Sequence, residues 1–363
     1  MSESSTESAP SSLLWEVIRY VIVAIAMGAL IWYYFFYTPP VYVSREHTGK
    51  TMGTDYVVKV AQFPETGDWS KIAAEIRSKL DDLDQKMSTY KKDSEVCRFN
   101  ASASTDDWFS ISPETAFLVH TSLEISRLTE GAFDITAGPL VRHWGFGAGS
   151  EPWQVRSYDE LKSASIPLKE KIGYEKLSVR LEPPALKKTI PELSIDLSAI
   201  AKGYAVDCIA TLLDERKIAN YLIEVGDELR IKGKKSKESN WNVGVEKPIP
   251  EFSAAQQIVP LKGQSLATSG NYLQTIQMDD RRVSHIIDPR SGLPSQIGGG
   301  TSEFASVSVV ASDCTSADAW ATALFVLGER KGIEFADQHG IAVLYLLRRG
   351  NEIIEIPSKH WKK

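Results

Sequence analysis

The chain has 363 residues, of which 43% are hydrophobic and 24% are charged, and its formal net charge is −6 at pH 7. These ordinary globular values exclude a disordered chain, a collagen-like fibre and a small disulfide scaffold. The acidic balance argues against a nucleic-acid-binding protein, because phosphate contacts need a basic surface.

An apolar segment near the N-terminus predicts a transmembrane helix. Residues 20–37 carry no charge, and a helix needs about 20 apolar residues to cross a bilayer. We expect a short polar segment over 1–12, an anchor over 13–37 and a linker over 38–47. A cleaved signal peptide and a buried core helix are the alternatives, but no small-residue cleavage site follows the apolar run. The flanking basic residues favour neither orientation.

The first half of the remaining chain predicts a strand followed by two helices. Residues 56–60 have the pattern of a strand, and apolar residues recur at helical spacing over 72–87, with Ser70 as the expected N-cap. Ser112 and Pro113 are expected to open a helix that continues to Leu128.

The second half adds strands and helices in mixed order. We expect helices over 200–213 and 316–327, the second ending at Gly328, and strands over 221–225, 305–311, 341–347 and 352–356, the last two joined as a hairpin. This order predicts an α+β domain, or an α/β domain with irregular connections, over 48–363 without an internal boundary. The three cysteines, Cys97, Cys208 and Cys314, lack the spacing of a zinc site or a disulfide framework.

Two glycine-rich segments could bring backbone close to a ligand. They are residues 51–54, and residues 131–139 followed by Trp144-Gly145-Phe146-Gly147. Either could equally be a simple turn. Neither matches the Rossmann or the P-loop fingerprint, so a classical dinucleotide-binding fold is not indicated.

Residues 195–204 place a carboxylate and a lysine at an expected junction of strand and helix. Asp196 would end the strand, and Ser198 and Lys202 would lie at the N-terminus of the following helix. Free amide groups at such a position can bind phosphate. The alternative is that Asp196 or Ser198 only caps the helix.

Two further segments carry candidate side chains. His285 is expected in a strand before a turn that contains Asp288, although a lone histidine is often structural. Asp318 and Thr322 stand four residues apart, so they lie on one helical face and offer oxygen ligands for Mg²⁺. The alternative is a capping aspartate and a threonine bonded to its own helix.

Taken in order, these segments resemble the ApbE family, the FAD:protein FMN transferases. One match alone is weak, but many in a fixed order are specific. The matching segments are 51–54, 87–90, 94–95, 98–100, 131–136, 195–207, 267–272, 284–289 and 318–322. The resemblance implies a T-fold-related α+β catalytic domain, here preceded by one transmembrane helix.

The resemblance also implies an activity and a location. Family members bind FAD and Mg²⁺, transfer FMN to a Ser or Thr of a target protein, and release AMP. Their targets are flavin-carrying subunits of membrane redox complexes, such as the sodium-pumping quinone reductase or Rnf-type complexes. A single-pass protein of the bacterial inner membrane with a periplasmic catalytic domain is therefore expected.

Site residues follow from the resemblance position by position. The backbone carbonyl of Ala199 and the side chains of Asp318 and Thr322 match the metal site. His285 is the candidate catalytic base, and Asp288 either orients it or belongs to the turn. The flavin-nucleotide contacts match Met52, Tyr90, Ala132, Phe133, Asp134, Asp196, Lys202 and Ile286.

Two positions depart from the family pattern. Ala321 stands where some relatives have an acid, which implies fewer protein ligands for metal, and Asp227 replaces a glycine in a Gly-Gly-Glu motif. A Mg²⁺-dependent FAD pyrophosphatase and a non-catalytic flavin-binding protein remain as alternatives. The sequence does not separate transferase from pyrophosphatase, because the nucleophile belongs to the other reactant.

Overall fold

The computed structural model describes residues 12–36, 41–150, 157–249, 254–272, 274–279, 281–295 and 304–362. The chain forms two compact units. One contains residues 1–43 and 64–66, and the other contains residues 44–63 and 67–363.

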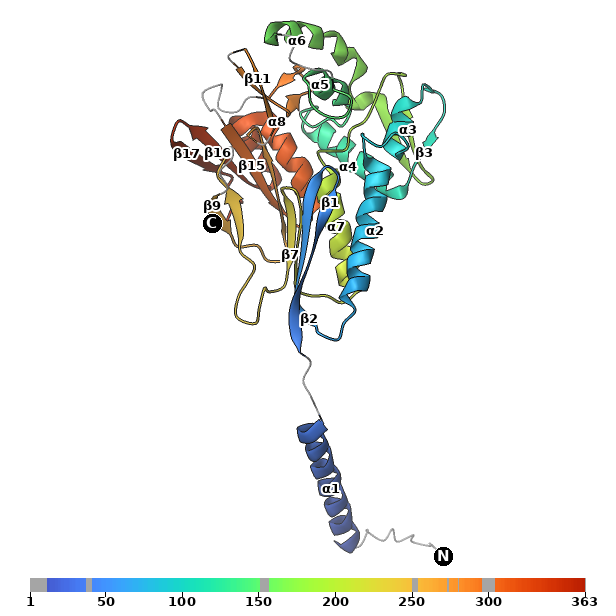
Figure 1. Ribbon diagram of the computed structural model, residues 1–363, viewed down its shortest axis with the longest axis vertical. Coiled ribbons are helices and arrows are strands. Elements are labelled where there is room, and N and C mark those ends of the chain that lie inside the picture. Colours follow the sequence, from blue (N-terminus) through green and yellow to red (C-terminus); the bar gives the residue numbers. More distant parts are fainter. Residues whose placement is uncertain are drawn as a thin grey trace, which may run out of the picture. The chain divides into compact units, whose positions relative to one another are not determined.

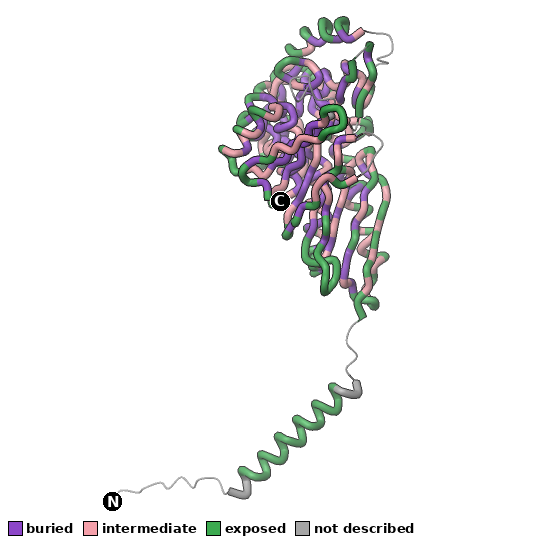
Figure 2. The backbone as a smooth tube through the Cα atoms, turned by 90° about the vertical axis from the view of Figure 1, so that its left-hand side faces the viewer, coloured by how far each residue is buried: buried purple, intermediate pink, exposed green. Residues whose placement is uncertain are grey.

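The first unit contains helix α1, Ser12–Phe36. Its segment Trp15–Tyr33 is long and apolar enough to cross a membrane, and none of it is buried; Figure 2 shows this helix as exposed. A signal sequence would have the same properties. Residues 1–11 of the expected polar segment and residues 38–40 of the expected linker lie outside the described residues.

The second unit is built on an eight-stranded sheet in the order β1-β2-β6-β7-β10-β15-β16-β17. Strands far apart in the sequence become neighbours, since β2 pairs with β6 and β7 with β10, both antiparallel. The strands are β1 Tyr42–Thr51, β2 Thr54–Pro64, β6 Tyr221–Val225, β7 Glu228–Lys232, β10 Ser265–Gly270, β15 Phe304–Ala311, β16 Ala342–Arg349 and β17 Glu352–Pro357.

Alternation along β16 shows what covers each face of the sheet. Val343, Tyr345 and Leu347 pack in one cluster with apolar residues of α8, whereas Leu344 and Leu346 pack with the β8–β9 hairpin on the opposite face. Helix α8 spans Cys314–His339, β8 Val243–Glu246 and β9 Ala255–Val259. Both faces of this part of the sheet are therefore buried.

A second group of helices packs near β2 (Figure 1) and against β6. Buried residues of α2 (Trp69–Met87), α4 (Pro113–Leu128) and α7 (Ala201–Glu215) share one apolar cluster with residues of these strands. The elements that complete this side are α3 Glu95–Ala101, β3 Phe109–Ser110, β4 Leu177–Leu181, β5 Pro184–Lys188 and the short 3-10 helix η3 Tyr174–Lys176.

A small lobe of short elements covers one end of the sheet. Apolar residues of α5, α6, β11, β12 and β13 form its separate core. The elements are α5 Gly138–His143, α6 Tyr158–Ser165, the 3-10 helix η2 Pro167–Lys171, β11 Thr275–Met278, β12 Arg281–Ser284, β13 Ile287–Asp288 and β14 Leu293–Pro294.

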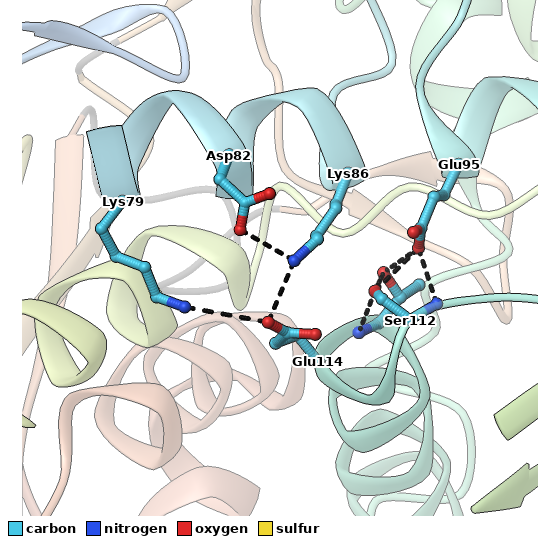
Figure 3. Close-up of polar contacts among 7 residues, drawn as sticks. Lys79, Asp82, Lys86, Glu95, Ser112 and Glu114 are labelled. Atoms are coloured by element: carbon cyan, nitrogen blue, oxygen red, sulfur yellow. Dashed lines mark hydrogen bonds and ion pairs between the residues drawn. The ribbon is translucent and has the colours of Figure 1, made fainter. Parts of the chain in front are cut away.

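Polar contacts fix the packing of α2, α3 and α4 (Figure 3). The Lys86 Nζ atom lies 2.8 Å from Asp82 and 3.0 Å from Glu114. The Glu95 carboxylate accepts hydrogen bonds from the amide and hydroxyl of Ser112, which caps α4 as predicted. These contacts hold the end of α2, from which the loop at Ser88–Tyr90 begins.

Most predicted elements are present, with four corrections. Asp68 rather than Ser70 caps α2, because the Asp68 carboxylate accepts from the Lys71 amide. Gly328 does break α8, with φ of 78°, but helix resumes directly and continues to His339. Asp196 does not end a strand, and His285 follows β12 rather than lying inside a strand.

Candidate active site

A cavity of about 440 Å³ lies in the second unit, and residues of the helices, the sheet and the small lobe line it. All predicted site residues except Asp288 line it. They are Met52, Tyr90, Ala132, Phe133, Asp134, Asp196, Ala199, Lys202, His285, Ile286, Asp318 and Thr322. Segments that are up to 270 positions apart in the chain, from Met52 to Thr322, therefore meet in one place.

The turn between β1 and β2 brings Met52 to this cavity. Met52 and Gly53 both have positive φ, 49° and 78°, as a two-residue hairpin turn that matches strand twist requires. Such a conformation is unfavourable for a residue with a side chain. The β1–β2 turn therefore holds Met52 in an unfavourable backbone conformation, and this conformation places Met52 in the lining of the cavity.

Backbone contacts fix the segment that carries Asp196. The Asn100 side chain donates to the Ile195 carbonyl at 2.9 Å and accepts from the Ile195 amide at 2.8 Å. The buried Lys188 ammonium donates to the Leu193 carbonyl at 2.9 Å. Asp196 accepts from the Ser198 amide, so its carboxylate stabilises the turn before α7, whose N-cap position is Ile200.

One side of the cavity, which we call the charged side, consists of Lys202 on α7, Glu228 on β7 and Asp318 on α8. Lys202 Nζ lies 2.5 Å from Glu228 Oε1, and the exposed fractions of Glu228 and Asp318 are only 2%. Burial opposes the charge on Lys202, but the carboxylates of Glu228 and Asp318 outweigh it and raise the Lys202 pKa. Burial also raises the pKa of Glu228, although the Lys202 ammonium opposes this shift.

The oxygen atoms on the charged side suit a hard cation. Asp318 Oδ2 accepts from the Gly203 amide at 2.9 Å, and the Thr322 hydroxyl lies 3.1 Å from the Ser269 hydroxyl. Glu228 Oε2 is buried and has no hydrogen-bond partner among the described residues. No group of three or more His, Cys, Asp and Glu side chains that could hold a metal occurs within the described ranges. A cation here would need carbonyl, hydroxyl and phosphate oxygens beside Asp318, which is the kind of donor set that Mg²⁺ accepts.

Asp134 is a partly buried carboxylate that accepts hydrogen bonds from neutral groups. It accepts hydrogen bonds from the amide and hydroxyl of Thr136 and from the Tyr174 amide. Burial raises its pKa to about 6, because these hydrogen bonds only partly offset the loss of hydration.

Another part of the cavity lining consists of Gln274 and His285, next to the β11–β12 hairpin. Together with Asp288, which does not itself line the cavity, we call it the hairpin side. The His285 Nδ1 atom lies 3.2 Å from the Gln274 carbonyl oxygen, and burial lowers the His285 pKa. Asp288 accepts from the amide and guanidinium of Arg290. The contacts described for Asp288 therefore support a role in stabilising the turn rather than in orienting His285.

Sequence reasoning did not assign several residues that line the cavity. Glu228 was noted only as part of a motif, and Asp227 only as a departure from it. The signal for Glu228 was its position three residues after the end of the strand predicted over 221–225, where a buried charge needs a partner. Phe146 belonged to a noted glycine-rich segment, and its ring lies 6.1 Å from the His285 ring, centroid to centroid.

Comparison with known proteins agrees with this picture. A model of the ApbE family matches residues 52–345. The FAD:protein FMN transferase of Vibrio cholerae is 38% identical over 315 residues, which cover 87% of this chain and 91% of that protein. The FAD:protein FMN transferase of Escherichia coli K12 is 37% identical over 316 residues, 86% of this chain and 87% of that protein.

Solved structures are similar as well. The flavin transferase ApbE from Vibrio cholerae has a TM-score of 0.77 at 36% identity, over 88% of this chain and 99% of that chain. The apo form of the Pseudomonas stutzeri flavinyl transferase ApbE has a TM-score of 0.76 at 33% identity, over 88% of this chain and 96% of that chain.

Proposed function

Because the chain belongs to the ApbE family, we propose that it is an FAD:protein FMN transferase that acts on a Ser or Thr hydroxyl and releases AMP. The observation that carries this proposal is the charged side of the cavity, where Lys202 and Asp318 lie beside the predicted flavin-nucleotide contacts. A lysine and a buried carboxylate next to a large cavity suit a ligand that joins a diphosphate to an apolar ring system.

The transfer step exchanges the phosphoanhydride bond of FAD for a phosphoester bond to the acceptor. The acceptor oxygen forms a bond to the phosphorus atom on the flavin side, and the bond from that phosphorus to the bridging oxygen breaks. AMP leaves with the bridging oxygen, and the hydroxyl proton moves to Nε2 of His285. A histidine whose pKa is lowered by burial is neutral near pH 7, so it can accept this proton.

The remaining site residues bind and orient. Lys202 would contact the diphosphate, and the Ala199 carbonyl, Asp318 and Thr322 would hold Mg²⁺. Bound Mg²⁺ would neutralise charge on the diphosphate and on the leaving AMP. Met52, Tyr90, Ala132, Phe133, Asp134, Asp196 and Ile286 would line the space for the flavin nucleotide.

We also propose a location and a class of acceptor. Residues 13–37 would anchor the protein in the bacterial inner membrane, with residues 48–363 as the catalytic domain outside the cytoplasm. The apolar segment Trp15–Tyr33 supports an anchor. Such a tether would keep the enzyme near flavin-carrying subunits of membrane redox complexes of the sodium-pumping quinone reductase or Rnf type.

The full chain in detergent, incubated with FAD, MgCl₂ and an acceptor domain, tests the proposal. Mass spectrometry should detect FMN on a Ser or Thr of the acceptor, together with an equal amount of AMP. AMP and free FMN without labelled acceptor would indicate a pyrophosphatase. A purified chain that binds FAD and forms neither product would contradict both activities.

A further inference from the structure

Helices α7 and α8 are in close contact at Gly203. A Cβ atom at this position would collide with the Cys314 carbonyl oxygen and with Asp318. The Gly203 amide instead donates to Asp318 Oδ2. The position of Asp318 thus depends on how the first turn of α8 sits against α7.

Asp207, one turn further along α7, binds that first turn. Its Oδ1 atom accepts from the Cys314 amide at 3.0 Å, and its Oδ2 atom accepts from the Thr315 amide at 2.8 Å and the Thr315 hydroxyl at 2.7 Å. The first amides of a helix have no partner within the helix, and a negative charge near them is favourable. A carboxylate from α7 therefore caps α8, in addition to its own N-cap Asp313.

Arg230 connects the same carboxylate to the sheet. Its Nη1 atom lies 2.5 Å from Asp207 Oδ1. Arg230 stands two residues after Glu228 on β7, so the two side chains share one face of the strand. Two ion pairs, Arg230 with Asp207 and Glu228 with Lys202, therefore join β7 to α7.

We propose that Asp207 is a positioning residue for the transfer reaction. It does not line the cavity. It fixes the first turn of α8 against α7 and β7, and Asp318 and Thr322 follow one and two turns later on α8. The position from which Asp318 and Thr322 would bind a divalent cation therefore depends on Asp207. A displacement of about 1 Å can cost about 10²-fold in rate. The inference rests on the proposed function.

The test compares Asp207→Asn with a matched control on the same helix. Asp214 is seven residues further along α7, binds the Tyr221 hydroxyl and Lys232, and lies outside the cavity. Asp214→Asn also removes a carboxylate that joins α7 to the sheet. We expect Asp207→Asn to raise the MgCl₂ concentration for half-maximal turnover about tenfold, and Asp214→Asn to leave it within twofold.

A second readout does not need turnover. Mn²⁺ is titrated into each protein in the presence of ADP and followed by electron paramagnetic resonance, with ADP alone as the blank. The dissociation constant of Mn²⁺ should rise about tenfold in Asp207→Asn only. The dissociation constant of ADP without metal should stay within twofold of the wild-type value in both variants. If Asp207→Asn unfolds, Thr315→Val removes a single hydroxyl donor and should show a smaller shift in the same direction.

The outcomes separate this inference from the proposed function. The positioning role would be overturned, even if FMN transfer occurs, if the Mn²⁺ dissociation constant were the same in the wild type, in the Asp207 or Thr315 variant and in the Asp214 variant. Absence of FMN transfer by the wild type would overturn the proposed function, whereas a Mn²⁺ constant that changes only in the Asp207 variant would still support the positioning of the ligands.

Discussion

The two sides of the cavity are built in different ways. On the charged side, Glu228 and Asp318 are almost completely buried, and they bond to an ammonium group and a helix amide. On the hairpin side, His285 contacts one backbone carbonyl and Asp288 pairs with the partly exposed Arg290. The charged side presents fixed charges in a fixed geometry, as binding a metal and a diphosphate requires. The hairpin side holds the partly exposed imidazole of His285, which can exchange its proton with solvent.

The largest effect is expected on the charged side. Asp318→Ala should reduce Mg²⁺-dependent FMN transfer at least about 10³-fold, because it removes a proposed side-chain ligand of the metal. Each factor of ten in rate corresponds to about 1.4 kcal/mol of transition-state stabilisation. The measurement is labelled acceptor per minute as a function of MgCl₂. An unchanged rate would contradict the proposal that Asp318 is a ligand of Mg²⁺.

Asp318→Asn controls for damage to the fold. Alanine leaves the Gly203 amide buried without a partner, which costs about 1–3 kcal/mol of folding free energy. Asparagine keeps an oxygen for this amide but removes the charge. We expect a melting temperature close to that of the wild type and a rate as low as that of the alanine variant. Recovery of activity in Asp318→Asn would mean that the hydrogen bond, not the charge, matters.

A smaller effect is expected on the hairpin side. His285→Ala should lower the rate about 10²-fold, which is the lower end of what a general base contributes. The His285 pKa is lowered, so the rate of the wild type should rise with pH through a value below 6.5 and then level off. This acidic limb should vanish in the variant. A limb that persists would assign the proton transfer to another group.

An effect on the stability of the fold is expected at Asp134. This residue is a partly buried carboxylate that has no ion-pair partner among its described contacts. Its pKa is raised from 3.8 to about 6, so the folded state holds the proton more tightly than the unfolded state. This contribution to stability is complete below pH 3.8 and is lost as the pH rises through 6, a change of about 3 kcal/mol. Asp134→Asn should therefore gain stability relative to the wild type between pH 4 and pH 7.

Urea unfolding of both proteins at several pH values checks this prediction. The amide of asparagine cannot accept from both Thr136 and Tyr174 as the carboxylate does, but this loss is the same at every pH. The difference between the two free energies of unfolding therefore isolates the titration. A difference that does not change with pH would contradict the raised pKa.

Local sequence signals were sufficient for most of the fold. The strand over Tyr221–Val225 has the predicted bounds, and Ser112 caps the helix that Pro113 begins. These elements depend on periodicity and capping, which neighbouring residues determine. The N-cap of α2 was predicted less accurately, because both Asp68 and Ser70 could cap the helix. The end predicted at Gly328 was also inaccurate, because a glycine with positive φ can either end or interrupt a helix.

The contacts between distant segments were not accessible from the sequence. The resemblance placed Lys202 and Asp318 in one site, but not the pairing of Lys202 with Glu228 or the bonds from Asp207 to the first turn of α8. These contacts join residues up to 108 positions apart. They arise only when the sheet order brings β7 beside α7 and α8, and no local pattern encodes that order.

The smallest effect is expected at Asp288. Asp288→Asn should change the transfer rate less than threefold and the folding free energy by less than about 1 kcal/mol, because its partner Arg290 is partly exposed and such pairs contribute little. The comparison with His285→Ala is made at pH 6 and pH 8. If Asp288 oriented the imidazole, its variant would share the loss of the acidic limb. An Asp288 variant with the pH profile of the wild type would restrict the function of the hairpin side to His285 and assign Asp288 to the turn.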